Sequence, residues 1–303
     1  MPKIITEDMI EQAAIKALQE RHDYNVLNCM TEEPDTLPDG TGRKDKKQVV
    51  LPDVMFESLC RINPDIPEQT VRTVVDELCR TPVSGDLMLT NYQNYQKIRN
   101  GITVEYNKNG KKTSNILRLL SYNDALSNTF TVASQMWIKG ETHWRRPDLI
   151  IFINGFPMVF IELKNSNIPV KNAYDINLKN YLKDIPYLFN YNQICVLSNG
   201  METRLGSFAA GYEFFFEWLK VENEKENPDR KAIRENCTSL EYFIAGLCEP
   251  KNLLDYIENF ILYDRRRTKI IAKNHQFFGV NNAYNAFLRR EELKGKLGVF
   301  WHT

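Results

Sequence analysis

The chain has 303 residues, which is enough to bury one large core, or one domain and part of another. Its 39 basic and 39 acidic residues balance, so the composition excludes a globally basic DNA coat, and any contact with nucleic acid must be local. The sequence has no apolar run near about 18 residues, no signal peptide and no C-x-x-C pair among its six cysteines, and it therefore predicts a cytoplasmic protein with free thiols, no membrane span and no zinc site.

Helices are expected in the first part of the chain. Thr6 can cap a helix that continues to Arg21, with two acidic residues in its first turn. Glu11 lies on the flank of the apolar face of that helix, where a carboxylate is usually solvated. Residues 49–62 and 68–79 predict a pair of helices separated by a proline-containing break.

The next segments predict strands. Residues 101–106 and 115–120 flank an Asn-Gly turn, residues 130–138 form a further strand, and all are expected in the same sheet as the hairpin that follows. Between residues 97 and 146, nine Lys and Arg side chains outnumber three acids. This excess predicts a phosphate-contacting surface, or, at residues 108–112, only a solvated hairpin tip.

The stretch from residue 146 to residue 164, RPDLIIFINGFPMVFIELK, predicts a buried β-hairpin. Its two apolar runs, 149–153 and 158–161, are short, and the Asn-Gly pair between them is a strong turn signal. With a three-residue loop at 154–156, the two runs pair as antiparallel strands.

Three charged side chains are then expected at the open end of this hairpin. Asp148 lies opposite Glu162 and on the same face, and Glu162 shares its face with Lys164, two residues further on. Two carboxylates at the rim of an apolar sheet repel each other unless a cation lies between them. Solvated edge charges are the alternative interpretation.

A hard divalent ion, most plausibly Mg²⁺, would satisfy both carboxylates and leave coordination positions for water and phosphate. The carbonyl oxygen of Leu163 could supply a further ligand. Lys164 would then orient or deprotonate the attacking water and offset the charge of the phosphorane-like transition state. This constellation predicts phosphodiester hydrolysis.

These residues also carry a family resemblance. Pro147-Asp148, thirteen residues and then Glu162-Leu163-Lys164 resemble the signature of PD-(D/E)xK nucleases, and the whole string is similar to the N-terminal nuclease region of type I restriction enzyme R subunits. The string LCRINPDIP, at residues 59–67, resembles the same subunits. The resemblance implies an α/β fold with a restriction-endonuclease-like mixed sheet flanked by helices, extra helices and a C-terminal helical connection.

The resemblance assigns three further candidates to the site. A glutamate from the first helix often approaches the metal in this family, and Glu11 is the matching residue. R subunits carry a Gln-x-x-x-Tyr motif after the catalytic lysine, which reads Asn177-x-x-x-Tyr181 here, on a helix expected at residues 174–185. Asn177 retains the amide but is shorter than Gln, and Tyr181 is equally compatible with a core position.

The remaining segments complete the expected fold. Residues 193–197 predict the last strand of the sheet, residues 253–262 and 269–288 predict helices, and residues 297–301 predict a buried strand. In R subunits such a strand leads into a Walker A loop, and this chain has no G-x-x-x-x-G-K-[ST] sequence. We therefore expect a fragment cut just before the motor, with an ATP site only in the full-length subunit.

The expected organisation is an endonuclease domain at residues 1–245, followed at 246–303 by a helical connection and the first strand of the absent helicase-like motor. The resemblance implies Mg²⁺-dependent cleavage of double-stranded DNA by a type I site-specific deoxyribonuclease. It also implies modification (methyltransferase) and specificity subunits as partners.

Two other functions stay open. One is a catalytically silent DNA-binding or assembly module that couples the motor to the methyltransferase complex. The other is a purely structural module, whose aromatic segment at residues 212–219 docks a partner, although aromatic side chains in such a segment more often belong to the core.

Overall fold

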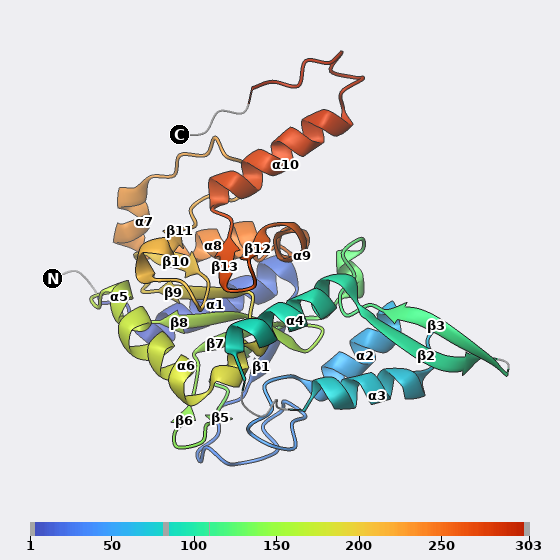
Figure 1. Cartoon of the computed structure of the whole chain (residues 1–303). Helices are drawn as coiled ribbons and strands as arrows, with labels where there is room; N and C mark the ends of the chain where they lie inside the picture. The colour runs from blue at the N-terminus through green and yellow to red at the C-terminus, as the bar shows by residue number, and fades with distance from the viewer. Residues whose placement is uncertain (1–3, 81–84, 109, 300–303) are drawn as a thin grey trace.

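The computed structural model describes residues 4–80, 85–108 and 110–299. Within them, seven strands form one mixed sheet in the order β1-β4-β7-β8-β9-β10-β11 (Figure 1). β1 pairs with β4, and β8 with β9, in parallel, and the other neighbours are antiparallel. The strands are β1 Asn25–Asn28, β4 Phe130–Ser134, β7 Leu149–Ile153, β8 Phe156–Leu163, β9 Ile194–Ser198, β10 Thr203–Gly206 and β11 Phe216–Glu217. The expected mixed α/β class is therefore observed.

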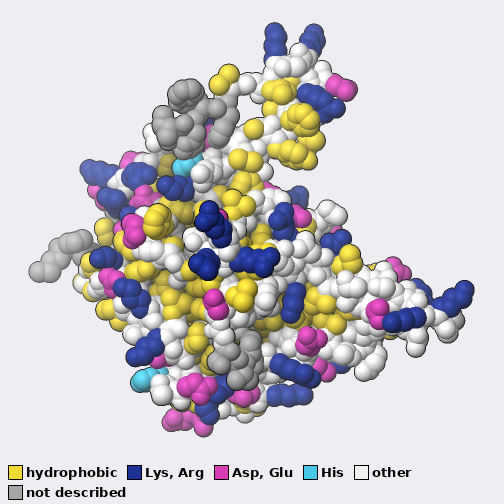
Figure 2. Space-filling model, in the orientation of Figure 1, with side chains coloured by type: hydrophobic (Ala, Val, Ile, Leu, Met, Phe, Trp, Pro, Cys, Tyr) yellow, Lys and Arg dark blue, Asp and Glu magenta, His cyan; other side chains and the backbone are white. Residues whose placement is uncertain are grey.

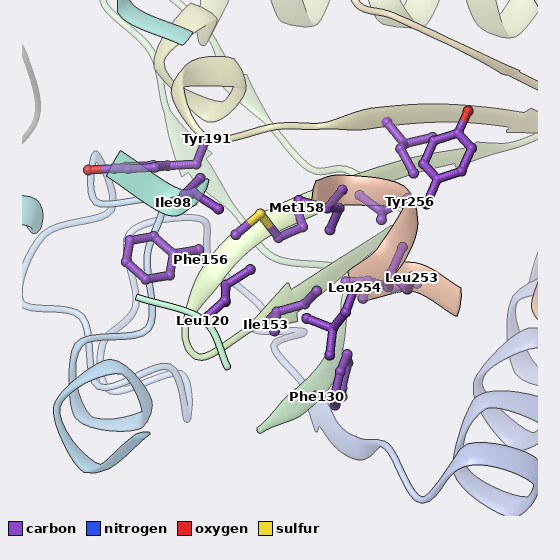
Figure 3. Close-up of a cluster of buried hydrophobic side chains, with 14 of the residues drawn as sticks. Ile98, Leu120, Phe130, Ile153, Phe156, Met158, Tyr191, Leu253, Leu254 and Tyr256 are labelled. Carbon is purple, nitrogen blue, oxygen red and sulfur yellow. The ribbon is translucent and has the colours of Figure 1, made fainter. Parts of the chain in front are cut away.

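Helices cover both faces of this sheet because its central strands are apolar on both sides. Ile151 of β7 belongs to a hydrophobic cluster with α1, α2, α3, α4, α8 and α9, whereas its neighbour Ile150 belongs to a second cluster with the helical segment α5 to α6. These helices are α1 Glu7–His22, α2 Pro52–Ile62, α3 Glu68–Leu78, α4 Leu87–Asn100, α5 Val170–Asn172, α6 Lys179–Asp184, α8 Ser239–Leu247 and α9 Pro250–Asn259. In Figure 3, side chains of β7 and β8 meet Leu253 and Leu254 of α9.

The central hairpin reaches the expected register by a different route. Its turn has two residues, Asn154 and Gly155, both with positive φ, as a type I′ turn requires, so the expected three-residue loop was wrong. A register shift beyond Ile151 inserts one extra residue in β8 and restores the pairing of Leu149 with Ile161. The open end of the hairpin therefore brings the segments of Asp148 and Glu162 together.

Two strand predictions were wrong in their sheet assignment. β2 (Ile102–Lys108) and β3 (Lys111–Leu117) form a separate two-stranded sheet that projects from the body of the molecule beside α2 and α3 (Figure 1). β2 buries only Val104 and Tyr106, so it lacks the two apolar faces that a central strand of this sheet needs. The strand expected at 130–138 ends at Ser134, residues 135–137 form no strand, and Ile138 begins β5 (Ile138–Lys139), which pairs with β6 (Trp144–Arg145).

The C-terminal part also departs from expectation. β9 is followed by β10 and β11, so it is not the last strand of the sheet. The helix expected at 253–262 ends at Asn259, and the one expected at 269–288 begins at Asn274, because β12 (Ile261–Asp264) and β13 (Thr268–Ile271) form a hairpin between α9 and α10 (Asn274–Leu288). Residues 297–299 form no strand and are exposed, unlike the expected buried strand, and residues 300–301 lie outside the described residues.

The remaining short elements are irregular or lie at the periphery. They are η1 Ala125–Ser127, the π-helical segment η2 Ala173–Leu178, η3 Pro186–Asn190, η4 Tyr212–Phe214 and α7 Arg230–Asn236. The described helices include none that is long and apolar enough to cross a membrane.

Candidate active site

The acidic pair lies where β7 begins and β8 ends. Asp148 directly precedes β7, and Glu162 is the penultimate residue of β8. Asp148 Oδ2 accepts a hydrogen bond of 2.7 Å from the backbone N–H of Leu163, which fixes that carboxylate against the end of β8. The two side chains are deeply buried, because Asp148 is only 7% exposed and Glu162 only 1%.

Lys164 is the cation of this group. Its backbone N–H donates to Ser198 O of β9 at 2.8 Å. Its ammonium donates to Glu162 Oε1 at 3.1 Å and to the carbonyl oxygen of Leu163, and it lies 3.6 Å from Glu7 Oε2 of α1. The positive charge of Lys164 therefore lies among the oxygen atoms that the sequence predicts as metal ligands.

Burial dominates the electrostatics of the two acids. It raises the pKa of Asp148 to about 7, against the opposing effect of the Leu163 N–H. Burial and the charge of Asp148 raise the pKa of Glu162 well above its usual value. Burial acts to lower the pKa of Lys164, but the charges of Glu162 and Glu7 outweigh it, and the pKa is raised. The nearby positive charge and the hydrogen bonds therefore do not offset the cost of burying the two carboxylates in their charged forms.

The residues present fit a hard divalent cation. Within the described part of the chain, no three Asp, Glu, His or Cys side chains converge closely enough to hold a metal ion by themselves. Glu162 Oε2, however, is a buried acceptor that makes no hydrogen bond of normal geometry to a described residue, although the Tyr181 hydroxyl lies close enough to lower the pKa of this carboxyl. Together with Asp148 and the Leu163 carbonyl, it offers an all-oxygen donor set, which is the set that Mg²⁺ prefers. A buried acceptor of this kind is a reason to expect a ligand at this point.

A cavity of about 370 Å³ opens beside Asp148, and Glu162 and Lys164 do not line it. Glu7 and Glu11 of α1 line it, together with Gln135, Arg146 and Asp148. Glu11 is only 5% exposed and accepts a hydrogen bond from Gln135 Nε2 at 2.5 Å, so the expectation of a solvated carboxylate was wrong. The reason is that α1 packs against the sheet with this flank turned towards the end of β4.

The two candidate residues on the helix after Lys164 have different surroundings. Tyr181 is buried, its hydroxyl donates to Arg146 O at 3.0 Å, and its ring packs edge-on against Phe160 at 5.3 Å. Burial, followed by the charge of Glu162, raises the pKa of Tyr181 well above its usual value. Asn177 lies in the π-helical segment 173–178, where an uninterrupted helix was expected. It is half-buried, and its side chain makes no hydrogen bond to a described residue.

The basic residues of the 97–146 stretch do not form one surface. Those at 108–112 lie at the exposed tip of the β2–β3 hairpin, on the right of Figure 2, where Lys112 pairs with Glu105 at 2.6 Å. Arg145 pairs with Asp184, and Arg146 lines the cavity with its guanidinium 4.9 Å from the Trp137 ring centroid. Among the described basic residues of this stretch, Arg146 alone lines the cavity beside Asp148.

Sequence reasoning missed Glu7 and Gln135 as members of this site. Glu7 was noted only as a first-turn acid, and its contact with Lys164 depends on how α1 lies across the sheet. Gln135 stands in a segment that was expected to be a continuous strand. No local pattern marks either residue, because both contacts join segments more than a hundred residues apart.

Comparison with known proteins decides the family. A family model described as the N terminus of type I restriction enzyme R proteins matches residues 4–214, more than half of the chain. The chain belongs to this family. The R-protein region is 33% identical, over 99% of its length, to the type I restriction enzyme HindI endonuclease subunit of Haemophilus influenzae, and covers 28% of that protein.

A second relative of this R-protein region is the putative type I restriction enzyme MjaIXP endonuclease subunit of Methanocaldococcus jannaschii, which is 28% identical over 99% of the chain. The chain covers 30% of that subunit. A third, the EcoprrI endonuclease subunit of Escherichia coli, is 28% identical over 52% of the chain. The R-protein region described here thus spans less than a third of the first two relatives.

Proposed function

We propose that this R-protein region is the DNA-cleaving module of a type I restriction enzyme, with a PD-(D/E)xK active site that hydrolyses phosphodiesters of double-stranded DNA in a Mg²⁺-dependent reaction. The observation that carries the proposal is the buried group Asp148, Glu162 and Lys164 at the open end of one hairpin, where Glu162 Oε2 makes no hydrogen bond of normal geometry to a described residue. Modification and specificity subunits are the proposed partners.

The proposed roles follow from the contacts. Asp148, Glu162 and the Leu163 carbonyl would hold the ion, which supplies Lewis-acid activation of water and of the scissile phosphate when bound. Lys164, whose pKa is raised, keeps its proton at neutral pH. Its ammonium therefore suits charge stabilisation and orientation of the attacking water better than removal of a proton.

Arg146 and Tyr181 would help to hold the DNA substrate at the site. The guanidinium of Arg146 lines the cavity beside Asp148 and can contact a DNA phosphate. The Tyr181 hydroxyl donates to the Arg146 carbonyl and also lowers the pKa of the Glu162 carboxyl, so Tyr181 acts on the site both through the backbone and directly. The contacts of Asn177 suggest no comparable role. In this proposal, residues 1–245 carry the nuclease and residues 246–303 connect it to the motor.

The proposal is tested by calorimetric titration of Mg²⁺ into the wild-type chain and into Asp148→Asn and Glu162→Gln. These isosteric changes keep the packing but remove the charge, so we expect each to abolish binding. Asp65→Asn, an exposed carboxyl elsewhere, is the matched control and should bind like wild type. A wild-type chain that binds no divalent ion, or site variants that bind equally well, would overturn the proposal.

A plasmid-nicking assay on the same samples separates the two functional classes. The nuclease is supported if the wild-type chain nicks the plasmid and Lys164→Ala does not, although Lys164→Ala still binds metal. Metal binding without any nicking supports the assembly module instead. For that module the aromatic segment offers little docking surface, because Phe215 and Trp218 are buried and Phe214 is the large exposed side chain, at 67%.

A further inference from the structure

Gln135 has a backbone conformation that glutamine rarely adopts. It follows the last residue of β4 and has φ 55°, in the left-handed region that normally selects Gly, Asn or Asp. Its backbone N–H donates to Asp148 O at 3.0 Å, so this strained residue is tied directly to the proposed metal-binding segment. Strain of this kind persists at functional sites when the surrounding contacts enforce it.

The side chain of Gln135 makes the second connection. Its Nε2 donates to Glu11 Oε2 at 2.5 Å, across the same cavity that Asp148 and Arg146 line. An amide is a neutral donor, so it orients a carboxylate without cancelling its charge. A Lys or Arg at this point would cancel that charge. One oxygen of the Glu11 carboxylate accepts this hydrogen bond, which leaves the other oxygen available to water or a cation.

We propose that Gln135 is a positioning residue that holds Glu11 on the cavity beside Asp148, close to the proposed metal site, and that its left-handed backbone serves this role rather than stability. The inference rests on the proposed function, because it assumes a divalent ion at Asp148 and Glu162. Gln135 itself does not bind the ion. It acts on the ion only through Glu11 and through the backbone of Asp148.

The test uses Gln135→Asn and Gln135→Gly in the 303-residue chain. Both residues adopt the left-handed conformation more easily than Gln, so we expect an equal or higher melting temperature. Neither presents an amide that reaches Glu11, so we expect Mn²⁺ and Mg²⁺ to bind about tenfold more weakly, the usual cost of losing an outer-shell partner. Stability and metal affinity should therefore change in opposite directions, which a purely structural role would not produce.

Two controls sharpen the result. Gln19→Ala removes an exposed amide of the same helix, α1, that does not line the cavity, and should leave the affinity unchanged. In a double-mutant cycle, Gln135→Asn should weaken binding no further once Glu11→Gln is present. Wild-type-like affinity of both Gln135 variants, parallel losses of stability and affinity, or additive effects with Glu11→Gln would overturn this inference alone. Failure of the wild type to bind metal would overturn the proposed function as well.

Discussion

At the scale of single residues, the site is organised by desolvation. Asp148 directly precedes β7 and Glu162 is the penultimate residue of β8, and the apolar packing that builds the hairpin also strips their carboxylates of water. The ammonium of Lys164 and the N–H of Leu163 offset only part of that cost. The same feature that attracts a cation therefore destabilises the metal-free protein when the acids are charged.

This cost predicts an unusual pH dependence. Burial raises the pKa of Asp148 from 3.8 to about 7, so between these values the folded protein binds more protons than the unfolded chain. The free energy of unfolding should therefore fall as the pH rises from about 4 to about 7, by at most about 1.4 kcal/mol per pH unit from this group. Glu162, whose pKa is also raised, contributes with the same sign.

Urea unfolding across this range, with EDTA present, measures the slope. Asp148→Asn should flatten it, whereas Asp65→Asn, which changes an exposed carboxyl, should leave it unchanged. Saturating Mg²⁺ should also flatten it, because the ion selects the deprotonated acids. A wild-type slope no steeper than that of Asp148→Asn would contradict the assignment of a buried, uncompensated acid.

At the scale of elements, the β7–β8 hairpin determines where the acids lie. Its two-residue turn is docked on the start of α2, where the Leu51 N–H donates to Gly155 O at 2.9 Å. The turn and the bulge in β8 together set the register, so the positions of Asp148 and Glu162 depend on the opposite end of the hairpin.

Gly155→Ala tests this dependence. Gly155 has φ +80°, and a Cβ there would lie 2.5 Å from Leu51 O and 2.9 Å from Met55 N. Rigid backbone on both sides leaves no room, so we expect a loss of about 3 kcal/mol or more in the free energy of unfolding. Gly110→Ala is the matched control, since it has φ +76° with nothing within 4 Å, and should cost only about 1 kcal/mol. Equal losses in the two variants, measured by denaturant unfolding, would show that the contact with α2 is unimportant.

At the scale of the whole molecule, a buried lysine joins distant parts of the chain. Lys269 of β13 is 2% exposed, and its ammonium donates to Asn91 Oδ1 of α4, to Asn192 O and to Gln193 Oε1 just before β9. Three acceptors match the three hydrogens of the ammonium, so the protein replaces its water shell. The β12–β13 hairpin is thereby anchored to the main sheet.

Lys269→Met should remove this anchor. It leaves the buried Gln193 Oε1 without its donor, whereas Asn192 O still accepts from Asn91 Nδ2 at 2.8 Å, and we expect a loss of about 1–3 kcal/mol in the free energy of unfolding. Lys251→Met, at an exposed position on α9, should change stability by less than about 0.5 kcal/mol. Thermal unfolding compares the two variants. A Lys269→Met protein as stable as wild type would show that apolar packing alone holds the hairpin.

Features that depend on residues close together in the chain follow from the sequence alone. The limits of β7, the Asn-Gly turn and the Thr6 cap of α1 follow from local periodicity and from local hydrogen bonding, and the structure has them where the sequence places them. The string around Asp148 and Glu162 likewise indicated the family that the comparisons show.

Only the tertiary structure decided which side chains meet and which lose their water. The burial of Glu11 and the left-handed Gln135 depend on segments far apart in sequence, and the bulge in β8 and the separate β2–β3 sheet are not marked by the apolar pattern of their own hairpins. β13 was wrongly predicted as helix for the same reason, since Lys269 is buried by acceptors from α4 and from the segment just before β9 rather than by an apolar stripe. Desolvation and long-range hydrogen bonding are properties of the assembled fold, and local sequence patterns carry little information about them.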